Sequence, residues 1–250
     1  MNLDDNVFKD VCNLLNKNRI NFWICHGTLL GIIRENRLLP WDHDMDFAVW
    51  DHETNKNHIV DIMLSHGYQQ QVITADMDCL HFFGQEKKID FSFYKIKDNI
   101  ASIKWAISPT DTFEKLMWFV LNNFSKNNDE ILTDHSIPKK VLLTVIRQFS
   151  LLLGFILPNK LKNIFNKKAM KRMKYTGYSY PMEIMQLKII EYAGMEIPVP
   201  FDSEACLQHT YGKDWKTPKD DWSFYDNENK DETGIEFIDV MWNYKDIDFV

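Results

Sequence analysis

Three aspartates at alternate positions are the clearest sign of a chemical site in this chain. Asp42, Asp44 and Asp46 lead into an apolar run that is rich in strand-forming residues. Because a strand sends alternate side chains to opposite faces, Asp44 and Asp46 share one face, with Asp42 as an additional candidate. Carboxylates held this close raise each other's pKa unless a cation lies between them, and hard oxygen ligands favour Mg²⁺ or Mn²⁺. The alternative is a solvated acidic turn before a buried strand.

A glycine-bounded turn upstream predicts an anion site. Residues 21–25 form a short apolar run that predicts a buried strand, and the helix that follows would present free backbone N–H groups. Gly27 would let the backbone approach a phosphate, Thr28 would cap the helix, and Arg34 would form a fork to phosphate oxygens. A tight turn with a close helix contact explains the two glycines equally well. The predicted donor-binding residues are His26, Gly27, Thr28, Gly31 and Arg34, with a histidine hydrogen-bonded to backbone as the alternative for His26.

A further acid lies in the alternating run 87–94. Its apolar residues at odd positions would face a core, which leaves Asp90 on the opposite face. The preceding run 79–83 and a turn at Gly84 predict a hairpin that returns Asp90 toward the first acids. Acids on adjacent strands could hold metal ions and leave one carboxylate near an attacking hydroxyl, a role we assign to Asp90; the alternative is a half-exposed strand residue. The predicted catalytic and metal-binding residues are Asp44, Asp46 and Asp90.

The predicted strands and helices around these residues indicate an α/β fold, with a small mixed sheet flanked by helices. Residues 3–18 have the periodicity of an amphipathic helix, and residues 58–66 predict a crossover helix that ends at a glycine. After the last predicted strand, the chain becomes mostly helical. We therefore predict a catalytic core over residues 1–105 and a mostly helical region over 106–250 that packs on it as a single compact unit.

Composition narrows the class of protein. A chain of 250 residues with 45% apolar content can bury one sizeable core, and a net charge of −7 argues against general nucleic-acid binding. The first residues lack the basic and apolar regions of a signal peptide, which predicts a cytoplasmic protein. Four scattered cysteines without a Cys-x-x-Cys pair predict reduced thiols.

One segment raises the question of membranes. Residues 141–157 are very apolar, but they are fewer than the ~20 needed to span a bilayer and include Arg147 and Gln148. After Pro158, the stretch Lys160–Lys174 carries seven basic residues and no acidic one, with apolar residues along one helical side. One interpretation is peripheral contact with an anionic membrane at its inner face. The alternatives are a buried helix followed by a solvated basic one, or a basic face that holds the acceptor.

Two motifs carry a family resemblance. The first motif, Gly27–Arg34 followed by Leu39–Asp46, resembles the LicD family, which belongs to the polymerase-β-like nucleotidyltransferase superfamily. The LicD family includes choline-phosphate transferases and the animal fukutin and fukutin-related proteins. Glu196–Trp215 is similar to the C-terminal signature of the family, which ends in Tyr-Gly-x-x-Trp. The matches occur in order and cover roughly residues 21–222. The chain departs from many relatives at His43, where they place another aspartate, and this leaves its donor or metal preference open.

The resemblance implies a metal-dependent phosphotransferase on a polymerase-β-like core. Such an enzyme moves a phosphorylated alcohol, such as phosphocholine or ribitol phosphate, from a CDP-linked donor to a hydroxyl of a cell-surface glycan or its lipid-linked precursor, and releases CMP. Two other classes stay open: a nucleotidyltransferase that uses a nucleoside triphosphate on a small molecule, and a catalytically silent scaffold for glycan assembly. No motif distinguishes one alcohol from another, because the residues from Gly27 to Asp46 would bind the metals and the diphosphate, which all CDP-alcohols have in common.

Overall fold

The structure is a computed structural model, and the chain in it divides into two compact units. The first unit contains residues 1–70, 78–103 and 177–239, and the second contains 71–77, 104–176 and 240–250. Most of the predicted basic helix over Lys160–Lys174 lies outside the described residues. The residues that the structure describes are 3–71, 78–106, 137–158, 160–161, 164 and 175–219.

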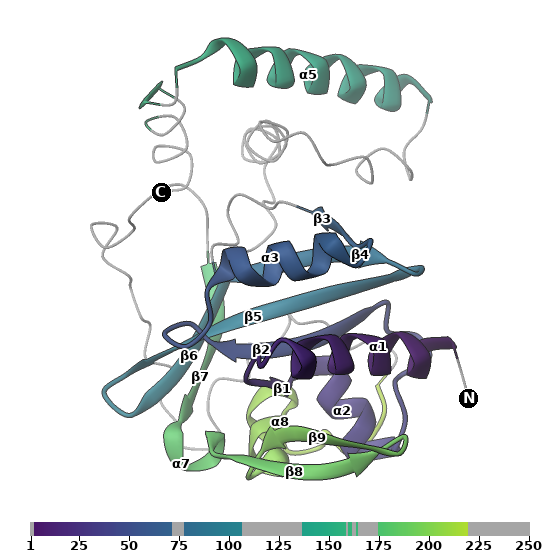
Figure 1. The fold of residues 1–250 in the computed structure, drawn as a ribbon, viewed down its shortest axis with the longest axis vertical. Coiled ribbons are helices and arrows are strands. Elements are labelled where there is room, and N and C mark those ends of the chain that lie inside the picture. Colours follow the sequence, from purple (N-terminus) through teal and green to yellow (C-terminus); the bar gives the residue numbers. More distant parts are fainter. Residues whose placement is uncertain are drawn as a thin grey trace. The chain divides into compact units, whose positions relative to one another are not determined.

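The fold is built on a mixed sheet, as predicted (Figure 1). Its main path runs in the order β1-β2-β5-β4-β3, while β6 pairs with β5 and β7 pairs with β6. Strand β2 is antiparallel to β1 and parallel to β5. The strands of this sheet are β1 (Phe22–Ile24), β2 (Asp44–Trp50), β3 (Gln69–Gln71), β4 (Cys79–Gly84), β5 (Lys87–Lys97), β6 (Ile100–Ala106) and β7 (Tyr175–Pro181).

Two helices, α1 (Leu3–Lys17) and α3 (Lys56–Ser65), cover the apolar face of the sheet, and Figure 1 shows them in front of the strands. The Phe8 and Phe47 ring centroids lie 5.8 Å apart, and the Lys56 ammonium lies 4.8 Å from the Phe93 ring centroid. A parallel pair of strands needs a crossover connection, and α3 lies within the one that joins β2 to β5. Both predicted helices are therefore confirmed.

The opposite face of the sheet carries α2 (His26–Glu35) and α8 (Ser203–Tyr211). Asp46 of β2 and Asp90 of β5 are side by side here, and the Gly27 amide of α2 donates to Asp46, so this is where the sequence predicts the site. The predicted alternation along β2 and β5 is confirmed, because Met45, Phe47, Phe91 and Phe93 are all buried in the core on the other face.

The predicted hairpin before Asp90 is also confirmed. Strand β4 is antiparallel to β5, and the two-residue turn between them, Gln85-Glu86, has φ angles of 53° and 64°. Two residues with positive φ suit the right-handed twist of a hairpin. Because β5 is also parallel to β2, this register sets Asp90 directly beside Asp46.

The C-terminal part of the first unit differs from the predicted helical region. Within residues 175–219 the structure has strands as well as helices, and residues 177–219 belong to the first unit. The hairpin turn at Ala193-Gly194 has φ angles of 51° and 75°, and the β-branched residues beside it favour strands. The elements here, besides β7 and α8, are α7 (Met182–Met185), β8 (Leu187–Tyr192) and β9 (Met195–Pro200).

In the second unit, α5 (Ile137–Ile156) ends shortly before Pro158. Among the residues described, no helix combines the length and apolar character needed to cross a membrane. All four cysteines are free in the structure.

Candidate functional site

Three carboxylates meet where β2 begins. Asp42, Asp44 and Asp46 each offer one oxygen, and these oxygens all lie within 4.8 Å of one another. Asp44 and Asp46 share a face of the strand, as predicted, while Asp42 reaches the same point from the preceding turn, where its amide donates to the Leu39 carbonyl at 3.1 Å. His43 has an exposed side chain and takes no part in the group. Asp42, at first an additional candidate, is thus the third member.

Gly27 lies against this group at the start of α2. Its amide donates to Asp46 Oδ2 at 3.0 Å, and a Cβ atom at position 27 would overlap Asp42 Oδ2. The sequence predicts close approach of an anion to this backbone, and in the structure the approaching anions are the two carboxylates. A glycine is therefore required here by space, because any side chain would displace Asp42 from its neighbours.

We expect Gly27→Ala to weaken binding of Mg²⁺ or Mn²⁺ by about tenfold or more, since the methyl group would separate Asp42 from Asp46. Titration calorimetry with each metal measures the effect. Gly194→Ala is the control: a Cβ there meets nothing within 4 Å, and the positive φ of 75° strains an alanine only in the β8–β9 turn, so this variant reports a loss of stability without a change at the carboxylates. Equal metal affinity in the two variants would contradict the role of Gly27 in leaving room for Asp42 beside Asp46.

Thr28 joins the helix to the strand. Its hydroxyl accepts a hydrogen bond from the Asp46 amide at 2.8 Å, and the residue is buried. The prediction that Thr28 caps the helix is wrong, because the N-cap is Cys25 and its side chain makes no capping hydrogen bond. Thr28 therefore holds the backbone of Asp46 in place.

Gly31 lies one turn further along α2. A Cβ there would lie 2.6 Å from the Arg37 carbonyl oxygen and 3.0 Å from Leu39 Cγ. The structure thus gives Gly31 the close contact between the helix and the following loop that the sequence left open as an alternative. Its predicted role toward a phosphate stays a prediction.

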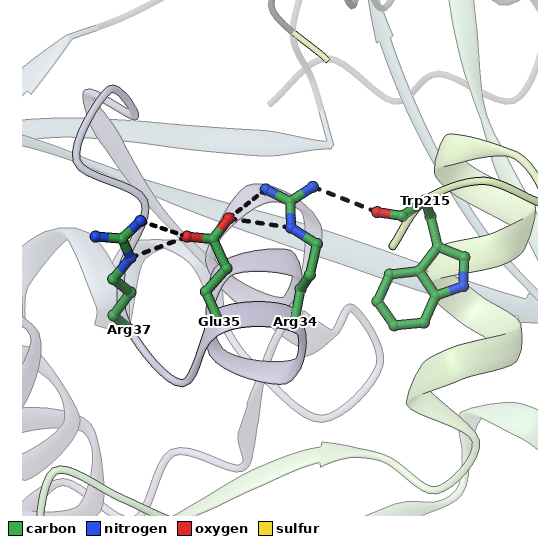
Figure 2. A network of polar contacts seen from close by, with 4 residues as sticks. All are labelled: Arg34, Glu35, Arg37 and Trp215. Atoms are coloured by element: carbon green, nitrogen blue, oxygen red, sulfur yellow. Dashed lines mark hydrogen bonds and ion pairs between the residues drawn. The ribbon is translucent and has the colours of Figure 1, made fainter. Parts of the chain in front are cut away.

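Arg34 lies in a polar network that Figure 2 shows from close by. Its guanidinium donates to Glu35 Oε1 from Nε at 3.1 Å and from Nη2 at 2.7 Å, and from Nη1 to the Trp215 carbonyl at 3.3 Å. Arg37 binds the other oxygen of the Glu35 carboxylate. The predicted fork is present, but in this structure it engages Glu35, and the third contact ties α2 to the chain beyond α8. A phosphate contact of Arg34 stays a prediction.

His26 is the first residue of α2, where it adopts a positive φ of 46°. Its ring centroid lies 5.7 Å from that of Tyr178 and 6.5 Å from that of Tyr94. Burial lowers the pKa of His26 to about 4, although the charges of Asp44 and Asp90 act in the opposite direction. A neutral imidazole therefore lies next to Gly27 at physiological pH.

Asp90 lies next to the three carboxylates on the neighbouring strand. Its Oδ2 accepts from Lys88 Nζ at 2.6 Å, and its Oδ1 lies 3.0 Å from His81 Nδ1. Burial acts to raise the pKa of Asp90, but the hydrogen bonds and charges of His81 and Lys88 together hold it below its ordinary value. The structure thus gives both oxygens of Asp90 protein partners, outside the group of three that could hold a metal. Its metal-binding role stays a prediction.

Lys88 connects Asp90 to the carboxylate group. Its ammonium lies 3.6 Å from Asp44 Oδ2 as well as 2.6 Å from Asp90 Oδ2. Burial alone would lower the pKa of Lys88, but the charges of Asp90, Asp44 and Asp46 raise it above its ordinary value. The sequence analysis missed this residue. Its position two residues before Asp90, on the same face of a predicted strand, was the available signal.

The carboxylates have the electrostatics of a site that requires a cation. Burial, together with a hydrogen bond and charge from Asp44, raises the pKa of Asp42 to about 7. Burial and the charges of Asp44, Asp90 and Asp42 raise the pKa of Asp46 well above its ordinary range. Three oxygen donors, their mutual repulsion and the close approach of Asp42 that Gly27 permits fit a hard divalent cation such as Mg²⁺ or Mn²⁺.

The raised pKa of Asp42 makes stability depend on pH. A carboxyl group whose pKa is higher in the folded than in the unfolded state stabilises the fold at low pH, and this contribution is lost as pH rises from about 4 through about 7. Without divalent metal, we expect the unfolding free energy of the wild type to fall over this range relative to Asp42→Asn. Denaturant unfolding in a chelator at several pH values measures this difference. Parallel pH profiles would contradict it.

The carboxylate group lies at the start of β2, on the face of the strand opposite Met45 and Phe47. A family model described as "LicD/FKTN/FKRP, nucleotidyltransferase domain" matches residues 19–147, just over half of the chain. The chain therefore belongs to the LicD family, and the predicted family resemblance is confirmed.

The comparisons with individual proteins are more distant. An uncharacterised protein of Rickettsia typhi (strain ATCC VR-144 / Wilmington) is 30% identical over 126 residues, which cover 50% of this chain and 40% of that protein. An uncharacterised protein of Rickettsia prowazekii (strain Madrid E) is 44% identical over 43 residues, covering 17% of this chain and 16% of that protein. The chain thus matches less than half the length of either relative.

Two solved structures of the antibiotic-resistance factor ANT(2'')-Ia are also similar. Its solution structure has 10% identity and a TM-score of 0.32, covering 67% of this chain and 91% of that chain. Its crystal structure with adenylyl-2''-tobramycin has 11% identity and a TM-score of 0.31, covering 67% and 97%. Both likenesses are distant.

Proposed function

We propose that this protein is a LicD-like phosphotransferase that moves a phosphorylated alcohol from a CDP-linked donor to a hydroxyl group of a cell-surface glycan or its lipid-linked precursor, with release of CMP. The observation that carries the proposal is the meeting of Asp42, Asp44 and Asp46 at the start of α2, with Asp90 on the next strand. Membership of the LicD family supports the class of reaction. The alcohol and the glycan are left open.

Asp42, Asp44 and Asp46 would hold a divalent cation, for which Mg²⁺ is our first choice and Mn²⁺ the second. When bound, such an ion supplies positive charge to the donor diphosphate and to the leaving oxygen of CMP. The protein supplies the position of its ligands. Gly27 and Thr28 fix Asp46 through one backbone and one side-chain hydrogen bond, so the carboxylates are already gathered before the donor arrives.

Asp90 would accept the proton of the attacking hydroxyl. Because its pKa is lowered, it carries a negative charge at neutral pH, and His81 and Lys88 fix the direction of its two oxygens. Asp90 lies outside the group of three carboxylates that could share a metal, and this favours the role of a base over that of a metal ligand. Phosphoryl transfer depends mainly on positioning and charge neutralisation, which this arrangement supplies.

A second candidate is a nucleotidyltransferase that uses a nucleoside triphosphate on a small molecule. It is favoured by the family model, which describes the matched region as a nucleotidyltransferase domain. The same carboxylates would serve this reaction, and only the released product separates the two candidates. A catalytically silent scaffold would have no need of this carboxylate cluster.

The decisive experiment screens the purified chain with Mg²⁺ against CDP-alcohols and nucleoside triphosphates. Thermal stabilisation identifies the donor, and the released product is then measured in the presence of candidate glycan acceptors. CMP release from a CDP-alcohol supports the proposal, while pyrophosphate release from a triphosphate supports the second candidate. Metal-independent responses, or none with any nucleotide, would support the scaffold and overturn both.

A further inference from the structure

Helix α5 presents an unusual apolar surface, which we call the α5 stripe. Its members recur at spacings of three and four residues and fall within about a third of the helix circumference. Phe155 is 87% exposed, and each of the others is more than half exposed. Thr144 lies at the edge of the stripe and Gln148 within it, and both are exposed as well. The α5 stripe consists of Val141, Val145, Phe149, Leu152, Phe155 and Ile156.

The stripe requires a partner because large apolar side chains gathered on one exposed face are unfavourable in water. At ~1.5 Å per residue, a helix of 20 residues offers a surface about 30 Å long. Two further exposed apolar residues, Leu161 and Ile164, follow the helix. The exposed surface therefore extends past the end of α5.

The charge of this segment indicates the kind of partner. Residues 136–174 contain ten lysines and arginines and no acidic residue, although the whole chain has a net charge of −7. The rest of the chain therefore has a net charge of −17. A positive segment this distinct from its own chain is complementary to an anionic surface, and two copies of it would repel each other.

We propose that α5 lies in the surface of an anionic membrane, with the α5 stripe buried among the lipid chains, and that the positive charge of the segment 136–174 attracts it to the phosphate headgroups. No described helix can cross a membrane, so contact is along the surface. The sequence predicts membrane contact through the basic segment Lys160–Lys174, and the exposed stripe adds an apolar surface that precedes it. This contact does not depend on the proposed reaction. It would bring the catalytic unit to acceptors carried on lipid.

Flotation of the full chain with vesicles tests the proposal. We expect binding to vesicles that mix phosphatidylglycerol with phosphatidylcholine, little binding to phosphatidylcholine alone, and weaker binding at high salt. Phe149→Ser/Phe155→Ser should reduce partitioning by about tenfold or more, because it removes two apolar anchors. Ile189→Ser/Phe201→Ser is the matched control, since both residues are 59% exposed but belong to the other unit.

Several results would overturn the proposal. One is absence of binding to anionic vesicles, and another is equal binding by the two double variants. Light scattering that shows a dimer in solution, dissociated by Phe149→Ser/Phe155→Ser, would assign the stripe to a second copy of the chain. Circular dichroism confirms that the variants keep their helix content. Unchanged vesicle binding by Asp46→Asn would show that membrane contact and catalysis are separate properties.

Discussion

Asp46→Asn is expected to lower turnover by about a thousandfold and to abolish metal-dependent stabilisation by the donor. Asp46 is the member of the carboxylate group that the fold holds most firmly. Its Oδ2 accepts from the Gly27 amide, and its own amide donates to the Thr28 hydroxyl. An asparagine can keep the first of these hydrogen bonds, so the variant removes the charge while the local structure is retained.

The same substitution should leave the protein folded and, without metal at neutral pH, more stable than the wild type. Burial and three neighbouring carboxylates raise the pKa of Asp46, so its charged form destabilises the metal-free fold. Loss of function accompanied by a gain in stability is the signature of a strained site. Chemical unfolding in a chelator, with and without Mg²⁺ and donor, measures both effects. Asp61→Asn, which removes an exposed acid on α3, is the control for charge alone.

A variant that retained wild-type metal affinity would contradict the site. Equal loss of stability in the metal-free and metal-bound forms would show instead that Asp46 acts only in the fold. The comparison with Asp61→Asn separates these outcomes because both variants change the net charge by the same amount.

The predictions from sequence were strongest where a local pattern determines the structure. The alternation in β2 placed Asp44 and Asp46 on one face, and the turn before β5 placed Asp90 in the strand beside them. Both follow from the two-residue period of a strand and from the short reach of a hairpin. Asp42 was harder to place, because it lies in a turn, where no period specifies the direction of a side chain.

Contacts between distant parts of the chain could not be predicted in this way. Arg34 has the spacing of a phosphate ligand, but its guanidinium reaches the carbonyl of Trp215, which lies 181 residues further along (Figure 2). Gly31 faces the loop after its own helix, and this contact depends on the path of that loop. The β8–β9 hairpin had a local signal in Ala193-Gly194, but the helical interpretation of the whole C-terminal region obscured it.

Asp90→Asn should reduce turnover by about a hundredfold to ten-thousandfold while donor binding is largely retained. Asp90 lies outside the group of three carboxylates, so removing its charge leaves the proposed metal ligands in place. An asparagine oxygen can still accept from Lys88 or His81, but an amide cannot take a proton from the attacking hydroxyl. The measurement compares single-turnover rates with donor affinity from calorimetry.

The outcome for Asp90 separates its two predicted roles. If it binds metal, Asp90→Asn will lower metal and donor affinity together with turnover; if it acts as the base, only turnover will fall. Asp98→Asn is the matched control, since Asp98 is an exposed acid in the turn at the end of the same strand, where its positive φ of 51° also suits asparagine. Near-normal turnover in Asp90→Asn would exclude both roles. The pairing of Asp90 with His81 would then be a structural contact between β4 and β5, and its pairing with Lys88 a contact within β5.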